Sequence, residues 1–175
     1  MGWVLVTYRL GSGGSSARVA VWREVRRSGA LQLQQSVVAF PDHATFSRAV
    51  ERLRALVSEV GGETLAVRAE PLVAADGTRL LDAWNEAREA EYTELVSECG
   101  KFLAEIDHEF EIEKFTLAEL DEEESALERL TRWHERIATR DLHGAPGSEE
   151  AGAALERAQD ALARYSTAVF ERTAP

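Results

Sequence analysis

The sequence predicts an α+β protein in which a small antiparallel sheet with two helices is followed by a region of helices alone. Short runs of β-branched and aromatic residues, typical of buried strands, are concentrated in the first 70 residues. Between Pro71 and Pro146 there is no proline, and apolar residues recur every three or four positions. These observations divide the chain into a first domain at residues 1–75 and a helical region at residues 76–175.

The first domain is expected to follow the order β-α-β-β-α-β. Its predicted elements are a strand at residues 3–9, a helix at 17–28, two strands joined around 34–36, a helix at 44–60 and a strand at 64–67. This order is the split βαβ pattern of ferredoxin-like domains, in which the helices cover one face of a four-stranded antiparallel sheet.

Apolar spacing and helix breakers define the two helices of this domain. In the first, Val21, Trp22 and Val25 recur at helical spacing and form its expected apolar face. The second helix follows Asp42, a residue type that caps helices, and ends at Gly61-Gly62.

The helical region is expected to contain three helices, at residues 78–114, at residues 117–140 and from the cap residue Ser148 onward. Thr116 and Glu119 form a capping-box signature at the start of the second. Because the connections are short, the helices should fold back antiparallel. Their apolar stripes are Leu81, Trp84, Arg88, Tyr92, Leu95, Cys99, Phe102, Ile106 and Phe110, then Leu120, Leu127, Leu130, His134 and Ile137, then Leu155, Ala158, Leu162, Tyr165 and Val169.

Charge is distributed unevenly along this chain of 175 residues and net charge −11. Residues 1–54 carry eight Arg against three acids, whereas residues 81–175 carry ten basic residues against 24 acids. A contact with a polyanion should therefore fall in the first part, and the acidic part should repel nucleic acid. The N-terminus has no signal-peptide pattern and no apolar run could span a membrane, so we expect a cytoplasmic protein that does not use a membrane.

Two stretches of the first domain resemble a known family. The sequence WVLVTYRL and the later RVAVWREVRRSGALQLQQSVVAFP are similar to the start of ChrB, a regulator of chromate resistance. The second half, in EAREAEYTELVSECGKFLAEI and RWHERIATRDLHGAP, resembles the corresponding ChrB segments. The matching residues in the first stretch are Arg18, Ala20, Val21, Trp22, Arg23, Arg26, Arg27, Gly29, Ala30, Gln34, Gln35 and Val37.

This resemblance implies a transcriptional regulator that binds DNA at the operator of a resistance operon. The family often carries a further C-terminal sensing domain, and we expect this chain to lack it, so the resemblance does not assign chromate binding to the chain. The domain is also similar, more distantly, to a middle domain of phenylacetate-type repressors and to small CRISPR-associated endoribonucleases. Two alternatives stay open: a protein-interaction module without catalysis, and a metal-dependent nuclease.

The candidate nucleic-acid contacts lie on the first helix. Arg23, Arg26 and Arg27 fall on the face opposite the apolar residues and form a predicted phosphate-binding patch; the alternative is a solvated helix face with basic residues suited to the helix dipole. Arg18 lies near the apolar face, where it either holds an anion at the helix N-terminus or has a structural role, stacking on Trp22 or pairing with a buried acid.

We expect no cofactor, no metal and no catalytic residue. The related nucleases hold a metal with an acid at the end of the first strand, where this chain has Thr7-Tyr8-Arg9. Glu105 and His108 give a single Glu-x-x-His pair, and a di-iron site needs two. The Gly11–Ser16 loop lacks the Lys of a phosphate-binding loop. Cys99, the one cysteine, lies on an apolar stripe and should behave as a small hydrophobe.

A homodimer is expected. The stripe on the first long helix exceeds what the small sheet can cover, and related ferredoxin-like domains pair through their sheets. A two-fold pair is the commonest way for one chain to cover such a surface.

Overall fold

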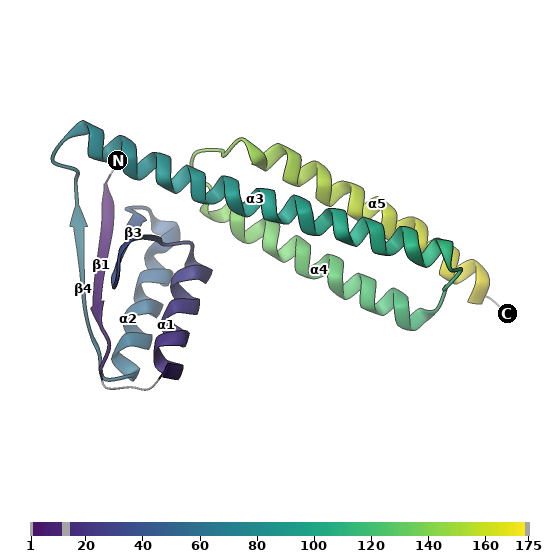
Figure 1. Cartoon of the computed structure of the whole chain (residues 1–175), viewed down its shortest axis with the longest axis horizontal. Helices are drawn as coiled ribbons and strands as arrows, with labels where there is room; N and C mark the ends of the chain where they lie inside the picture. Colours follow the sequence, from purple (N-terminus) through teal and green to yellow (C-terminus); the bar gives the residue numbers. More distant parts are fainter. Residues whose placement is uncertain (1, 12–14, 174–175) are drawn as a thin grey trace. The chain divides into compact units, whose positions relative to one another are not determined.

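The computed structural model describes residues 2–11 and 15–173, and it divides into two compact units, Met1–Ala87 and Arg88–Pro175. Part of the Gly11–Ser16 loop, residues 12–14, lies outside the described residues. Figure 1 shows a sheet with helices packed on one side in the first unit and long helices in the second part of the chain. The predicted α+β class is confirmed.

The first unit has the element order that the sequence predicts. The bounds are β1 Trp3–Arg9, α1 Ser15–Ser28, β2 Leu31–Gln34, β3 Val37–Pro41, the short 3₁₀ helix η1 Ala44–Phe46, α2 Ser47–Glu59 and β4 Glu63–Ala69. The four strands are antiparallel in the order β2-β3-β1-β4. Helix α1 ends where expected, because Gly29 adopts a positive φ of 69° that other residues rarely tolerate.

The start of the second helix differs from the prediction. Asp42 does not cap it; its carboxylate instead accepts a hydrogen bond from Arg68 at 3.0 Å. The chain first forms the single turn η1, where the ring nitrogen of His43 accepts a hydrogen bond from the Thr45 amide. Asp42 is therefore paired with Arg68 of β4 and does not act as the predicted cap of the helix.

One face of the sheet packs on the helices. Val4 pairs with Phe40 and Val6 with Val38 across β1 and β3, so these four side chains share a face. Val6, Val38 and Phe40 are fully buried. Figure 1 shows α1 and α2 together on one side of the sheet. Burial of this face against the helices forms the core of the unit.

The other face of the sheet is also apolar. Leu5 pairs with Ala39 on β3 and Val67 on β4, and the next row on this face joins Thr7 to Leu65. Leu65 is 60% exposed and Val67 41%. A sheet that meets water on one side ordinarily places polar residues there. This face departs from that pattern.

An aromatic cluster joins the start of α3, which runs from Ala74 to Glu111, to the sheet. Trp84 is 1% exposed and meets Trp3 edge-on at 6.2 Å and Phe46 at 5.2 Å between ring centroids. Phe46 in turn contacts Phe40 at 5.9 Å. Edge-to-face pairs of this kind add to the free energy gained by burying the rings. The first turns of α3 therefore belong to the first unit.

Helix α3 begins and ends earlier than the spacing predicts: it runs from Ala74 to Glu111, whereas the expected bounds are residues 78–114. It ends at Glu111 because Glu113 adopts a φ of 54°, in the left-handed region, and the Lys114 amide turns back to the Glu109 carbonyl at 3.0 Å. Asp76 lies within its first turn and pairs with Arg79.

The second unit packs the rest of α3 with α4 Leu117–Arg140 and α5 Gly147–Thr173. Consecutive helices run antiparallel, as predicted: the Tyr92 hydroxyl near the start of this segment of α3 reaches Asp141 at the end of α4. The Tyr165 hydroxyl, late in α5, donates to the Lys114 carbonyl at 2.6 Å, just beyond the end of α3. The buried stripes supply the core, with Leu95, Cys99, Ile106, Ile137, Ala158, Tyr165 and Val169 among its members.

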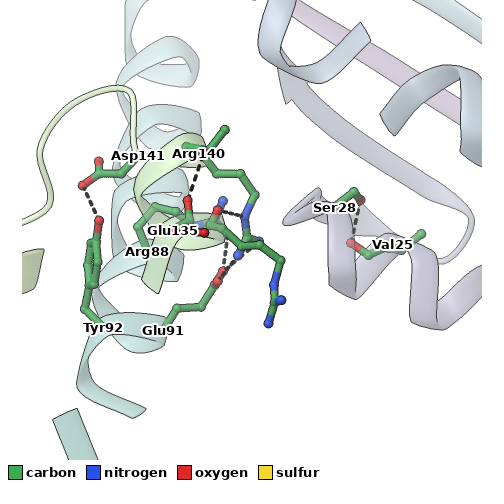
Figure 2. Close-up of polar contacts among 10 residues, drawn as sticks. Val25, Ser28, Arg88, Glu91, Tyr92, Glu135, Arg140 and Asp141 are labelled. Atoms are coloured by element: carbon green, nitrogen blue, oxygen red, sulfur yellow. Dashed lines mark hydrogen bonds and ion pairs between the residues drawn. The ribbon is translucent and has the colours of Figure 1, made fainter. Parts of the chain in front are cut away.

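Acidic side chains from neighbouring helices fix the loop between α4 and α5. Asp141 accepts hydrogen bonds from the amides of Gly144 and Ala145, both at 2.9 Å. The Glu89 carboxylate of α3 accepts the Gly147 amide at 2.6 Å, so it caps α5 in place of the predicted Ser148. Figure 2 shows Tyr92 directed at Asp141 and Arg140 reaching toward Glu91.

Replacing Trp84 tests the aromatic cluster. Trp84→Ala should lower the free energy of unfolding by about 3–5 kcal/mol, because it removes a buried ring and leaves a cavity. Urea denaturation followed by circular dichroism measures the change. Trp22→Ala, at an exposed site, is the matched control and should change stability by less than about 0.5 kcal/mol. Equal effects of the two substitutions would contradict this account of the cluster.

Candidate functional site

The exposed face of α1 carries its arginines. Arg18, Arg23, Arg26 and Arg27 are all exposed. The buried face consists of Ala17, Val21, Glu24, Val25 and Ser28. The expected patch of Arg23, Arg26 and Arg27 therefore lies on the outer surface of the helix, and Arg18 lies there as well.

Glu24 is buried in the helix interface, and the apolar spacing did not reveal it. It is 5% exposed, and its carboxylate pairs with Arg27 at 2.7 Å and with Arg52 of α2 at 3.1 Å. Glu24 is three positions after Val21 and therefore on the same side of the helix, which is the sequence signal that locates it. Its burial has two consequences: Arg27 is held by an ion pair, and the only acid of α1 is withdrawn from the outer face.

Trp22 lies outside the core, contrary to the expectation that it belongs to the apolar face. Its side chain is 53% exposed, whereas Val21 and Val25 are buried. The buried side of α1 forms a line along the helix that includes Val21, Glu24 and Val25. Trp22 lies outside that line.

The cation that covers Trp22 is Arg26. Its guanidinium carbon lies 5.4 Å from the centroid of the indole ring, within the range of a cation–π contact. The alternative in which Arg18 packs in the core is wrong, because both Arg18 and Trp22 are exposed. In the described part of the chain, neither Arg18 nor Arg23 forms an ion pair, so these two guanidinium groups face water.

A second candidate lies between α2 and β4. A cavity of about 390 Å³ there is lined by the basic residues Arg54 and Arg68 and by the acidic residues Asp42 and Glu51, among others. Arg68 is already paired with Asp42. The lining thus carries little net charge and gives no reason to favour an anion or a cation.

A few acidic residues of the second unit form a structural cluster near the C-terminal end of α3. Glu109 and Glu123 are buried, and Lys114 pairs with Glu119 at 2.7 Å and with Glu109 at 3.7 Å. Among the described residues, no three His, Cys, Asp or Glu side chains come together as metal ligands. Glu105 and His108 are exposed, and His108 lies 3.9 Å from Glu111.

Burial shifts the pKa values of several groups in this unit. Burial raises the pKa of Glu123, and the nearby carboxylate of Glu105 raises it further. Burial is also the main cause that raises the pKa of Tyr92 to about 12, with Asp141 adding to it. Cys99 is buried among apolar residues, and burial raises the pKa of its thiol, as expected for a packing residue.

The comparison with protein families now bears on this arrangement. A family model described as "Protein ChrB, N-terminal" matches residues 18–175. The chain belongs to the ChrB N-terminal family. That family is linked to chromate resistance, and the predicted resemblance is confirmed.

The ChrB N-terminal match starts at Arg18 on α1 and continues through all three long helices. It therefore covers both the arginine face and the acidic helical unit. No curated protein matches the chain. Within residues 2–11 and 15–173, each helix is too short or too polar to cross a lipid bilayer.

The raised pKa of Glu123 gives a prediction about pH. Because the pKa of Glu123 is higher in the folded state, the folded state binds the proton more tightly than the unfolded state does. The protonated carboxyl therefore stabilises the fold at low pH, and this stabilisation is lost as the pH rises through the folded-state pKa. Glu123→Gln should therefore raise the melting temperature at pH ~7 by more than at pH ~4, near the ordinary pKa of Glu.

Melting at the two pH values measures this difference. Glu124→Gln removes the same charge at the next, exposed position and should change melting little at either pH. A gain from Glu123→Gln that is the same at both pH values would contradict the assignment.

Proposed function

We propose that the chain is a non-catalytic, DNA-binding regulator of chromate resistance that contacts DNA phosphates with the outer face of α1. The observation that carries this proposal is a helix face with four exposed arginines and no exposed acid, in a chain of net charge −11. A polyanion is the partner that this charge pattern favours.

The fold is consistent with this role. Element order and the strand order β2-β3-β1-β4 support a ferredoxin-like assignment for the sheet and its two helices. The 14 residues of α1 span about 21 Å at 1.5 Å per residue. Duplex DNA carries one phosphate charge per ~1.7 Å of its axis, so several phosphates lie within reach of one helix. A role at a promoter also implies a cytoplasmic protein.

Not all of the arginines are equivalent. Arg27 neutralises buried Glu24, so Arg27→Ala would remove an ion pair of the fold as well as a cation. Arg23 faces water without an ion pair in the described chain, and Arg26 contacts only an exposed indole ring there. Arg23 and Arg26 are therefore the cleaner probes of phosphate binding.

The double variant Arg23→Ala/Arg26→Ala tests the proposal. Binding to duplex DNA from the gene's own upstream region should weaken, and the magnitude of the salt slope should fall by about 2, because each arginine–phosphate pair contributes about 0.9. Fluorescence anisotropy at a series of salt concentrations gives both values. Melting should be nearly unchanged because both side chains are exposed.

A matched control carries the same change in charge on the acidic helices. Arg136 and Arg164 are exposed there, and Arg136→Ala/Arg164→Ala should leave the salt slope unaltered. If the α1 double variant binds DNA as the wild type does, DNA binding by α1 is rejected.

A second proposal concerns the homodimer. The outward sheet face around Leu5, Leu65 and Val67 is apolar up to the Arg9–Glu63 ion pair in its last row, and such a surface without net charge is self-complementary under a two-fold axis. Four strands ~4.8 Å apart and about five residues long give a face of roughly 19 by 17 Å. This is small beside the ~800 Å² per partner of a standard interface. We therefore propose a reversible dimer in which a second copy covers this face.

Leu65→Lys/Val67→Lys tests the sheet-face dimer. Placing charges on the face should convert the dimer to a monomer in sedimentation velocity runs over a range of micromolar concentrations. Leu72→Lys is the control, since Leu72 is fully exposed but lies outside the strands. A wild type that sediments as a monomer throughout this range, or a double variant that still dimerises, would overturn the proposal and favour a different partner for this face.

A further inference from the structure

We propose that Trp22 is a nucleobase-binding residue, which stacks on an unpaired or unstacked base while the surrounding arginines hold the phosphates. This inference rests on the proposed DNA-binding function and adds a contact that is not electrostatic. It also gives a role to a residue that the fold does not use, because Trp22 lies outside the buried line of α1.

The exposure of Trp22 is unusual within its own unit. Trp3 and Trp84, the other two tryptophans there, are 2% and 1% exposed, whereas Trp22 leaves half of its surface in water. Val19, one turn earlier on the same side of the helix, is also exposed. An exposed indole beside an exposed valine leaves apolar surface in water without helping the core, and contact with a partner would remove that surface from water.

The charges around Trp22 select the kind of partner. Arg18 lies four residues before it and Arg26 four residues after it on the same side of the helix, so cations border the ring along the helix in both directions. Glu24, the only acid of the helix, is buried and paired. An aromatic ring bordered by cations is the arrangement that proteins use to bind exposed bases with their phosphates. An apolar protein surface would leave these cations without partners.

The contact between Arg26 and Trp22 prepares the ring for this role. The guanidinium group lies 5.4 Å from the ring centroid and restricts the positions that the indole can adopt. Trp22 nevertheless stays 53% exposed to water, so part of the residue is free for a further contact. Stacking on bases tolerates any sequence because every base has a π-face. We therefore expect Trp22 to favour single-stranded or locally opened DNA over intact duplex.

The experiment compares Trp22→Ala with the wild type on two probes, an oligothymidylate single strand and a duplex of mixed sequence. Loss of one stacked base should weaken single-strand binding by about 5- to 150-fold, from 1–3 kcal/mol per base. The salt slope should not change, because every arginine that pairs with a phosphate is retained. Trp22→Phe should retain most of the affinity, and Leu72→Ala, at an exposed apolar residue outside α1, should leave it unaltered.

Fluorescence provides an independent measurement. Trp3 and Trp84 are buried and Trp133 is partly buried, so quenching on addition of the single strand should come from Trp22. The quenching should disappear in Trp22→Phe while binding persists.

The outcomes separate this inference from the proposed function. If Trp22→Ala binds both probes like the wild type, or if quenching persists in Trp22→Phe, the stacking role is overturned and phosphate binding by α1 is left standing. A salt slope that falls in Trp22→Ala would overturn it as well, since Trp22 would then act only by positioning Arg26. Failure of the wild type to bind either probe at low salt would overturn the proposed function and this inference together.

Discussion

The ion pairs of buried Glu24 determine what the first unit presents to its surroundings. A carboxylate withdrawn from water needs cations close by, and Arg27 and Arg52 supply them from α1 and α2. Once Glu24 faces inward, the rotation of α1 is fixed, since Val21 and Val25 lie on the same side. The same rotation places Trp22, Arg23 and Arg26 outside. The interaction that holds the two helices together thus also exposes the candidate binding surface.

The aromatic cluster around Trp84 has a comparable effect on the boundary of the first unit. It packs the first turns of α3 on the sheet through Trp3 and Phe46, although these turns belong to a helix of 38 residues. The second unit is organised differently. Its helices bury long apolar stripes, and acidic side chains such as Asp141 and Glu89 satisfy the backbone amides where α5 begins.

Charge is separated between the two units. The first has ten Arg against nine acids, and the second has ten basic residues against 22 acids. A polyanion would be attracted to the outer face of α1 and repelled by the helical unit. The ChrB N-terminal family model covers both units from Arg18 onward, so the acidic helices are as much a part of this domain as the arginine face.

The sequence by itself determined the order of the elements and several helix ends, such as the end of α1 and both ends of α4. These depend on local physics: periodic apolar residues, the positive φ of Gly29, and the Thr116 hydroxyl that accepts the Glu119 amide at 3.2 Å. The family resemblance and the placement of four arginines on α1 could also be read from the sequence. These features need no knowledge of what a helix packs against.

Tertiary structure alone decided which side of α1 is buried. Val21, Trp22 and Val25 cover a broad arc of the helix, and periodicity does not tell which part of that arc meets the sheet. Burial of Val21 and Val25 favours one part of the arc, and Arg52, which is 28 residues away in the chain, supplies a cation for Glu24 on that side. The apolar pattern therefore predicts Trp22 in the core, whereas it lies in water with Arg26 rather than Arg18 over its ring. A contact between distant residues carries a free energy that a local pattern does not contain, and here it sets the surface on which the proposed function depends.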